Sequence, residues 1–240
     1  MKQKRVLIKL SGEALALHNN EKNIEQAYDF NQVNTIADVL VKAHNEGVQI
    51  CLVIGGGNIW RGRQAGSDMN PATADQMGML STMLNCLCMA DAIRQKGVKA
   101  LVQSAVGMPG FADNFDMHKA DEALENGKIV LFALGLGHPF FITDTAVVLR
   151  ARQMQVDEIL MAKNIDGVYS ADPKTDPNAE FIPEISYTKA LEMNLKVMDA
   201  SAFTMLVEGG IPAVKLFSLK DPQNLLRVLK GEKLGTLLHK

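Results

Sequence analysis

Short apolar runs alternate with longer segments of helical periodicity along the whole of this 240-residue chain. The apolar runs predict strands at residues 6–10, 48–54, 100–102, 129–134, 158–162 and 213–217. The segments between them predict helices at residues 31–45, 72–96, 119–125, 145–154, 188–195, 201–208 and 223–230. Strands that alternate with helices form parallel sheets, because each crossover lays a helix against a face of the sheet. The order therefore predicts an α/β fold with a mostly parallel central sheet and helices on both faces.

The composition suits a well-packed globular domain and excludes several classes of protein. Hydrophobic residues make up 47% of the chain and charged residues 22%, which excludes a disordered chain and a disulfide-stapled miniprotein. The formal net charge of -2 argues against binding of bulk duplex nucleic acid, which needs a basic face, but leaves room for a local cluster of Arg and Lys around a phosphorylated small molecule. The cysteines show no paired CxxC spacing, so we expect free, buried thiols and no zinc site.

The sequence gives no sign of membrane insertion or export. The N-terminal residues lead directly into a predicted strand, without the apolar segment of a signal peptide. The uncharged run at residues 76–90 is shorter than the roughly 20 residues of a membrane span and contains polar side chains. We therefore expect no membrane segment and a cytoplasmic location.

Two segments stand out from the regular alternation. Residues 163–185 show no helix or strand periodicity and contain Pro173, Pro177 and Pro183, which makes them the candidate boundary between two lobes. The predicted helix at residues 75–94 is apolar around most of its circumference, and such a helix has to be buried on more than one side. Two interpretations of this helix remain open: it is enclosed by the core, or a second subunit covers its outer face.

Glycine-containing segments follow three of the predicted strands. They are Lys-Leu-Ser-Gly-Glu at residues 9–13, Gly-Gly-Gly-Asn at 55–58 and Gly-Leu-Gly-His-Pro at 135–139. Ligands of parallel sheets bind at the carboxyl ends of the strands, and glycine lets backbone N–H groups approach phosphate oxygens. One such segment is as well explained by a tight turn, but three together indicate a site for several phosphate groups. P-loop, dinucleotide-binding and protein-kinase motifs are absent from the sequence, so this site would use another scaffold.

Basic residues flank the first two glycine segments. Lys9 ends the first strand, where its ammonium is either solvated or directed at a transferring phosphoryl group. Arg61 and Arg63 follow the second segment, in either an exposed turn or a loop that binds an anion. His138, inside the third segment, is assigned no catalytic role.

Acidic and aromatic residues near these segments each have two interpretations. Asp144 is either the N-cap of the helix at residues 145–154 or the group that orients Lys9 or a magnesium-bound phosphate. Asp75 is either a helix cap or an acceptor for ribose hydroxyls. Tyr169 and Asp172 are either turn residues or part of a nucleotide site in which Tyr169 lies against the base.

A set of ordered motifs extends over essentially the whole chain. They occupy residues 9–12, 55–58, 75–80, 139–141, 143–144, 166–169, 171–173, 196–199 and 231–236. In these motifs the chain resembles the bacterial uridylate kinase family, a branch of the amino-acid kinase superfamily. The first two motifs are typical of the superfamily. Asp-Gln-Met-Gly-Met-Leu, Asp-Gly-Val-Tyr-Ser-Ala-Asp-Pro and Lys-Val-Met-Asp point to the uridylate kinase branch.

The resemblance implies a fold, an activity and an assembly. The fold is a three-layer α/β/α sandwich in one domain of residues 1–240, with an acceptor lobe at 1–155 and an ATP lobe at 156–240. The activity is transfer of the ATP γ-phosphoryl group to UMP, giving UDP, with Mg²⁺ carried by ATP and no metal-ligating residue assigned. Such proteins are homohexamers, built as trimers of dimers, that GTP activates and UTP inhibits. The helix at residues 75–94 would match their dimer-forming helix.

The resemblance also implies roles for individual residues. The catalytic residues are Lys9, Arg61 and Asp144, with Asp144 organising Lys9. The implied ATP contacts are Lys9, Ser11, Gly12, Gly57, Arg61, Lys163, Asn164, Tyr169 and Asp172, the last four of them to adenosine. The implied UMP contacts are Gly56, Asp75, Leu136, Gly137, His138, Pro139, Phe140, Phe141, Ile142 and Thr143.

The sequence departs from the pattern of this family in two places. One place is the acceptor loop, residues 136–143, which the resemblance assigns to UMP. There, Leu136, His138 and Ile142 replace a threonine, an asparagine and a small polar residue. Residues 113–123 are more acidic than the matching segment of the family. Two alternatives therefore stay open: a kinase of the same fold that acts on another small anionic acceptor, and a catalytically silent, nucleotide-binding regulatory assembly.

Overall fold

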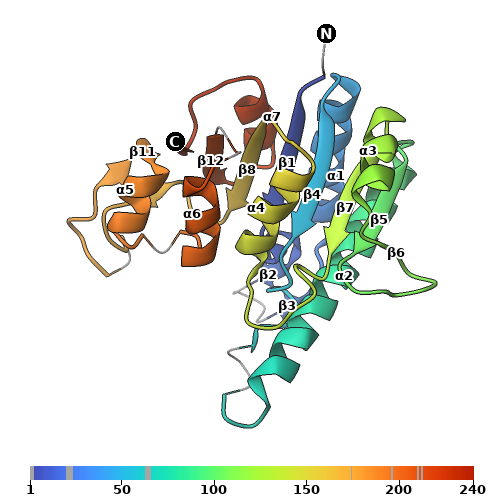
Figure 1. Ribbon diagram of the computed structural model, residues 1–240, viewed down its shortest axis with the longest axis horizontal. Helices are drawn as coiled ribbons and strands as arrows, with labels where there is room; N and C mark the ends of the chain where they lie inside the picture. The colour runs from blue at the N-terminus through green and yellow to red at the C-terminus, as the bar shows by residue number, and fades with distance from the viewer. Residues whose placement is uncertain are drawn as a thin grey trace.

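The computed structural model describes residues 3–19, 24–62, 66–173, 175–195, 197–209, 211 and 213–240. Arg63 and Lys196, which belong to predicted motifs, lie outside the described residues. Within the described residues, nine strands form one central sheet (Figure 1). Its order is β11 (Glu184–Ser186), β13 (Thr236–His239), β12 (Ala213–Ser218), β8 (Glu158–Lys163), β1 (Arg5–Leu10), β4 (Gln49–Ile54), β7 (Ile129–Ala133), β5 (Ala100–Ser104) and β6 (Asp113–Asn114).

The sheet is mostly parallel, as the sequence predicts. Every pair of neighbouring strands is parallel except β12 and β13, which are antiparallel. Each of the six predicted strands is present, with bounds that differ from the prediction by no more than two residues.

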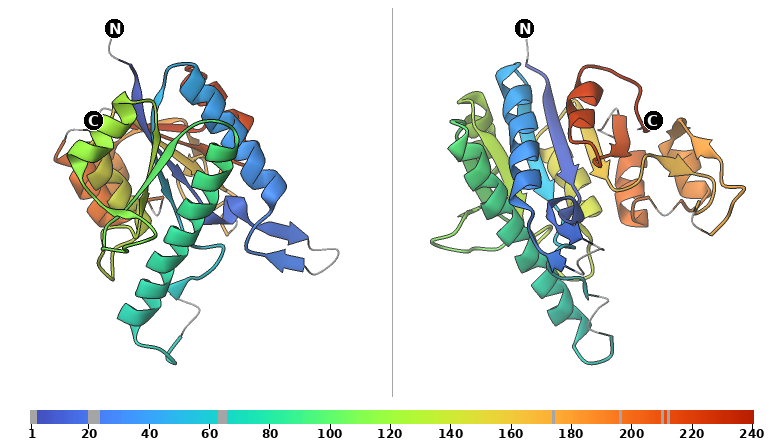
Figure 2. Two further views of the ribbon diagram at one scale, coloured as in Figure 1. Left: turned by 90° about the vertical axis from the view of Figure 1, so that its right-hand side faces the viewer. Right: turned by 180° about the vertical axis from the view of Figure 1, so that it is seen from behind.

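Helices cover both faces of the sheet, so the chain forms three layers (Figures 1 and 2). One face packs against α1 (Phe30–Asn45), α2 (Pro71–Gln95) and α7 (Gln223–Leu229). The other face packs against α3 (Met117–Glu125), α4 (Thr143–Gln153), α5 (Tyr187–Glu192) and α6 (Ala200–Val207). The three-layer α/β/α architecture that the resemblance implies is confirmed.

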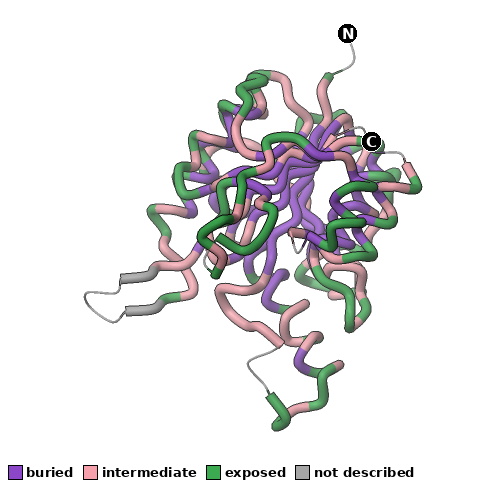
Figure 3. Tube along the Cα trace, turned by 90° about the vertical axis from the view of Figure 1, so that its left-hand side faces the viewer, coloured by how far each residue is buried: buried purple, intermediate pink, exposed green. Residues whose placement is uncertain are grey.

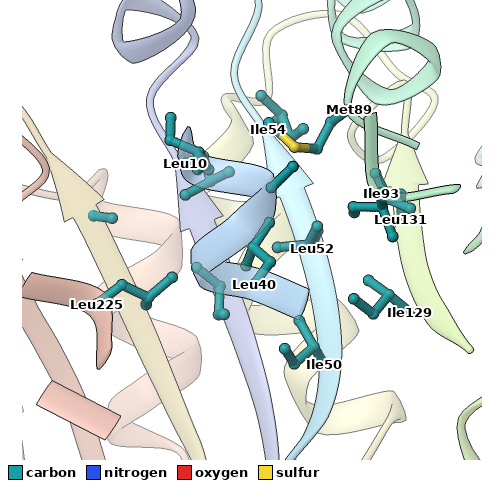
Figure 4. Packing of buried hydrophobic residues seen from close by; sticks show 14 of the residues in the cluster. Leu10, Leu40, Ile50, Leu52, Ile54, Met89, Ile93, Ile129, Leu131 and Leu225 are labelled. Atoms are coloured by element: carbon teal, nitrogen blue, oxygen red, sulfur yellow. The ribbon is translucent and has the colours of Figure 1, made fainter. Parts of the chain in front are cut away.

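Successive strand side chains alternate between the two helical layers, as the pleat of a strand requires. In β1, Ile8 and Leu10 lie in the core under α1, α2 and α7, whereas Leu7 lies in the core under α3–α6. Figure 4 shows the first of these cores, where Leu10 shares a cluster with Leu40 of α1 and Met89 of α2. Figure 3 shows the buried residues concentrated along the strands.

The cysteines are free, as predicted, and two of them are fully buried. Cys51 lies in β4 and Cys86 in α2, while Cys88 is partly exposed. Burial raises the pKa of Cys51 and of Cys86 to about 12, so both stay neutral thiols at ordinary pH.

Polar N-caps explain why several helices begin before their predicted first residue. The Asp29 carboxylate accepts hydrogen bonds from the backbone N–H groups of Asn31 and Gln32 at the start of α1. Asp116 caps α3 and Asp199 caps α6 in the same way. Each cap satisfies backbone donors that the first turn of a helix leaves unpaired, and so extends the helix to that position.

The sequence prediction missed the short strands. β2 (Leu17–Asn19) pairs with β3 (Ile24–Gln26), and β9 (Val168–Tyr169) pairs with β10 (Phe181–Ile182) inside the segment predicted to be irregular. β6 and β11 form the two edges of the main sheet, and β13 lies between β11 and β12. Runs of two to four residues are too short for an alternating pattern to identify them.

The apolar helix α2 is not enclosed by the chain. Met83, Cys86 and Met89 lie in the core, but Leu80 is 49% exposed and Leu84 51% exposed. Its N-terminal half extends beyond the edge of the sheet (Figures 1 and 2). The interpretation of α2 as a central core helix is therefore wrong. No helix in the described part of the chain, α2 included, is long and apolar enough to cross a membrane.

The lobe boundary that the resemblance implies, between residues 155 and 156, falls between α4 and β8, whereas the irregular segment at residues 163–185 begins at the end of β8. The sheet continues across this position, because β8 pairs with β1 in parallel. The division into an acceptor lobe and an ATP lobe stays a prediction.

Candidate active site

The three glycine segments meet at one edge of the central sheet. β1 lies between β4 and β8 and is parallel to both, so the carboxyl ends of these strands lie together, at the lower edge of the sheet in Figure 1. The first segment leaves β1, the second leaves β4, and the third leaves β7, the other neighbour of β4. This is the edge at which parallel α/β sheets bind their ligands.

The first two glycine segments are in direct backbone contact. A Cβ atom added at Gly12 would overlap the carbonyl oxygen of Gly55 and lie 2.6 Å from Oδ1 of Asn58. A Cβ atom at Gly56 would lie 2.7 Å from the carbonyl oxygen of Gly78 in α2. Only glycine fits at these two positions, since the loop after β1, the loop after β4 and α2 pack without space for a side chain.

A pair of amide side chains, one of them fully buried, fixes the loop after β4. Asn85 of α2 is fully buried and donates hydrogen bonds to the Gly55 carbonyl oxygen at 2.6 Å and to Asn58 Oδ1 at 2.7 Å. Asn58 donates in return to Asn85 Oδ1 at 3.1 Å and to the Ala27 carbonyl oxygen at 2.8 Å. The sequence prediction missed Asn85, although an asparagine in the middle of an apolar helix was the signal that could have found it.

A carboxylate shared by two lysines lies beside these loops. Asp144 Oδ1 is 3.3 Å from Lys9 Nζ, and Asp144 Oδ2 is 3.1 Å from Lys163 Nζ. Lys9 is 9% exposed and Asp144 5% exposed. Residues two apart in a strand face the same side of the sheet, so Lys9 faces the same side as Leu7 and Lys163 the same side as Met161. This is the side covered by the layer of helices that contains α4, and the two lysines therefore reach Asp144.

Asp144 does not cap its helix. α4 begins at Thr143, its N-cap residue is Ile142, and no side chain caps it. The capping interpretation of Asp144 is therefore wrong, and its carboxylate in the first turn is directed to the two lysines. Burial alone would raise the pKa of Asp144, but the charges of Lys9 and Lys163 outweigh it and hold that pKa below its ordinary value.

Arg61 contacts the glycine loops after β1 and β4. Its Nε donates to the Gly57 carbonyl oxygen at 3.2 Å, and its guanidinium forms an ion pair with Glu13. Glu13 belongs to a short 3₁₀ turn, η1 (Gly12–Leu15), and also accepts a hydrogen bond from Asn164 Nδ2 at 2.7 Å. Glu13, which the sequence prediction missed, therefore ties the loops after β1, β4 and β8 together.

Asp75 connects α2 with the acceptor loop, residues 136–143. The N-cap of α2 is Asn70, so the capping interpretation of Asp75 is wrong as well. Asp75 Oδ2 instead accepts a hydrogen bond from the backbone N–H of Phe140 at 2.8 Å. Phe140 has a φ angle of 69° and is 74% exposed, so this bond holds a left-handed turn at the surface.

The remaining residues of the acceptor loop lie at the surface or near the second glycine segment. Leu136, Gly137 and Pro139 are half-buried, while His138, Phe141 and Ile142 are exposed. Gly137 has a φ angle of 81° and packs against Ala105 and Val106. Thr143 is half-buried beside Gly55.

A cavity of about 460 Å³ lies beyond the end of β8. Tyr169, Asp172, Leu195 and Val197 are among the residues that line it. The Tyr169 hydroxyl donates to the Asp166 carboxylate at 3.1 Å, which raises the pKa of Tyr169. Of the four residues implied to hold adenosine, the structure brings Tyr169 and Asp172 to this cavity.

Lys163 and Asn164 do not line that cavity and lie on the side of the glycine loops. Ser11 extends β1, since its backbone N–H donates to the Ala162 carbonyl oxygen at 3.2 Å. This edge of the sheet thus brings together a buried carboxylate paired with two lysines, an arginine, and glycine loops whose backbone is not covered by side chains. Such a combination can bind several phosphate groups and offset their mutual repulsion.

Comparison with known proteins gives consistent results. The model of the amino acid kinase family matches residues 4–214. The UMP kinase of Ureaplasma parvum is 34% identical, with a TM-score of 0.91 over 100% of both chains. The UMP kinase of Bacillus anthracis is 32% identical, with a TM-score of 0.91 over 100% of this chain and 97% of that one. The uridylate kinase of Archaeoglobus fulgidus, at 24% identity and a TM-score of 0.73 over 97% and 99% of the two chains, shares the fold.

The contact between the glycine segments predicts the effect of adding one methyl group. Gly12→Ala should lower the free energy of unfolding by about 2 kcal/mol, because the new Cβ atom overlaps backbone that cannot move freely. Urea denaturation followed by circular dichroism measures this change. Gly78→Ala is the matched control: its Cβ atom would have no neighbour closer than 3.9 Å, and alanine favours the helix. Equal stability of Gly12→Ala and the unaltered protein would contradict the close contact.

Proposed function

Because the chain belongs to the amino acid kinase family, we propose that it transfers the γ-phosphoryl group of ATP to UMP, giving UDP and ADP. The observation that carries the proposal is the convergence of three glycine segments on the Lys9–Asp144 pair at one edge of the sheet. The choice of UMP as the acceptor rests on the full-length similarity to two UMP kinases. This reaction belongs to pyrimidine nucleotide synthesis, and its nucleotide substrates favour a cytoplasmic location.

The chemistry of this transfer needs positioning and positive charge rather than a general base. The acceptor oxygen belongs to a phosphate whose second pKa is about 6, so it is largely ionised at neutral pH. The barrier comes from bringing two anions together in line. Lys9 and Arg61, with the backbone N–H groups of the glycine loops, offset that repulsion in the positions where the structure holds them.

A magnesium ion fits this site as a partner of ATP. The described residues contain no group of three or more His, Cys, Asp or Glu side chains that could hold a metal. Asp144 is engaged by two lysines and Glu13 by Arg61, so the donor set suits an ion held mainly by phosphate oxygens. When bound, the ion would supply further charge neutralisation between the phosphates.

The two nucleotides are assigned to opposite sides of the glycine loops. ATP would place its base and ribose in the cavity lined by Tyr169 and Asp172, with its phosphates over Ser11, Gly12, Gly57 and Arg61. UMP would lie against Gly56, Asp75 and the acceptor loop. In this proposal the acceptor lobe is residues 1–155 and the ATP lobe residues 156–240.

The first test is ADP release from purified protein with Mg-ATP and, in separate reactions, UMP, CMP, dCMP, GMP and AMP. We expect UMP to be the preferred acceptor. Preference for another acceptor would support the same-fold alternative, in which Leu136, His138 and Ile142 are the replaced residues of the acceptor loop. Nucleotide binding without turnover of any acceptor would contradict the proposal and support the regulatory alternative. Adding GTP or UTP to the same reactions tests the proposed activation and inhibition.

Lys9→Ala tests the charge at the centre of the site. Its kcat should fall by about 100-fold or more, because Lys9 ends β1 beside the first glycine segment with its ammonium buried against Asp144. Thermal unfolding should change little in comparison. The control is Lys189→Ala, which removes an exposed lysine of α5. A kcat within a factor of two of the unaltered protein would remove Lys9 from the mechanism.

Asp75→Ala tests the acceptor side. The loss of the bond to Phe140 and of an acceptor for ribose hydroxyls should raise KM for UMP about tenfold, with a smaller change in KM for ATP. Steady-state kinetics with each substrate varied in turn provide the measurement. Asp38→Ala on the surface of α1 is the control. An equal rise in both KM values would place Asp75 outside the acceptor site.

The proposed assembly is a homohexamer, a trimer of dimers in which α2 packs against α2 of a second copy. The exposed face of α2 supports it, since Leu84 borders an apolar groove of about 400 Å³ together with Tyr28, Phe30 and Cys88. An apolar groove beside exposed leucines is typical of a surface covered in an oligomer.

Leu84→Glu should therefore reduce the assembly to smaller species, because a carboxylate would be buried in the apolar contact. Size-exclusion chromatography with light scattering measures the mass. Leu191→Glu, on the exposed side of α5, is the matched control and should leave the mass unchanged. An unchanged mass for Leu84→Glu would show that α2 does not form the contact.

A further inference from the structure

Lys163 lies beside Asp144 and not among the residues that line the cavity of Tyr169 and Asp172. It ends β8, next to β1, and its ammonium is 3.1 Å from Asp144 Oδ2. The other carboxylate oxygen of Asp144 is 3.3 Å from Lys9 Nζ. The cavity that contains Tyr169 and Asp172 is not lined by Lys163. Lys163 therefore belongs by geometry to the group around Asp144.

The second lysine changes the charge of this group. When the side chains are ionised, the formal charges of Lys9 and Asp144 sum to zero. Adding the charge of Lys163 gives the group a net charge of +1. An ammonium that has a carboxylate to itself is largely neutralised and attracts a phosphate less strongly. Because Lys163 takes one oxygen of Asp144, the Lys9 charge stays partly uncompensated and available to an anion.

Lys163 also connects Asp144 to the wall of the nucleotide cavity. Its ammonium donates to the Val197 carbonyl oxygen, and Val197 lines that cavity. A second connection runs beside it, since Thr145 Oγ1 donates to Asp199 Oδ1 at 2.8 Å and Asp199 caps α6. The position of the Asp144 carboxylate is thus fixed from β1, β8 and the segment before α6.

We propose that Lys163 is a positioning residue for phosphoryl transfer, which holds the Asp144 carboxylate and keeps the charge beside Lys9 positive, rather than a contact to adenosine. This inference rests on the proposed function. Three groups face the Lys163 ammonium: Asp144 of α4, Lys9 of β1 and Asp199 before α6. Burial lowers the pKa of Lys163, Asp144 and Asp199 oppose the effect, and the charge of Lys9 adds to it.

The kinetic test compares Lys163→Met and Lys163→Arg with the unaltered protein. Lys163→Met should lower kcat at least tenfold and change KM for ATP less than threefold, while Lys163→Arg should recover part of kcat. As pH rises, Lys163 loses its proton and activity should fall. This alkaline fall should move to higher pH in Lys163→Arg, because arginine stays charged. Lys189→Met is the control and should match the unaltered protein in every measurement.

Two kinetic results would overturn the inference. A large rise in KM for ATP with kcat unchanged would make Lys163 an adenosine contact. If activity falls at the same alkaline pH in Lys163→Arg as in the unaltered protein, Lys163 has a merely structural role. Circular dichroism checks that the variants fold, and Lys163→Gln replaces Lys163→Met if the methionine variant does not.

A binding-independent measurement separates this inference from the proposed function. Carboxyl ¹³C NMR follows the titration of Asp144. Its resonance is identified as the one that is missing in the Asp144→Asn variant. Lys163→Met should raise the pKa of Asp144, because one of the two charges that lower it is removed. An unchanged Asp144 titration would overturn the inference even if UMP is the acceptor. A raised pKa together with no turnover by the unaltered protein would uphold the charge coupling and reject the proposed function.

Discussion

The parallel pairing of β1 with β4 on one side and β8 on the other is the constraint on which the site depends. The register sets Lys9 opposite Val53 and Met161, so three strands end within one residue of each other and their loops leave at the same edge. β1 is buried on both faces, so its pleat fixes which side each residue faces. A slip of one residue would turn Lys9 away from α4 and toward α1, and would separate it from Asp144.

Burying charge at this edge is costly, and the structure shows how the cost is limited. Asp144 is almost fully buried, but each of its oxygens has an ammonium partner, so neither is left unpaired. Lys163 has a backbone carbonyl as a further acceptor. Because these groups are held by strands and by the first turn of a helix, they need little rearrangement to meet an incoming anion, which is the property that makes fixed charges effective in phosphoryl transfer.

The sequence predicted what depends on local pattern and missed what depends on contacts between distant segments. The apolar runs and glycine segments were sufficient to place Lys9 at the carboxyl edge of the parallel sheet. The start of α4 was predicted two residues late, and for this reason capping stayed open as an interpretation of Asp144 beside the orientation of Lys9. The Asp144–Lys163 contact depends on the strand register, and the Glu13–Arg61 pair depends on the packing of two loops. No periodicity or spacing in the chain carries that information.

One helix, α2, connects the glycine loops of the site with the exposed apolar face. α2 contacts the second glycine segment at Gly56, fixes it through Asn85 and holds the acceptor loop through Asp75. Leu84 is exposed one residue before Asn85 in the same helix. Side chains one residue apart point about 100° apart around a helix, so one turn of α2 serves both surfaces. One side of α2 packs against the core and the loops, and another side is apolar at the surface. Because both sides are apolar, α2 is apolar around most of its circumference, although the chain covers only part of it.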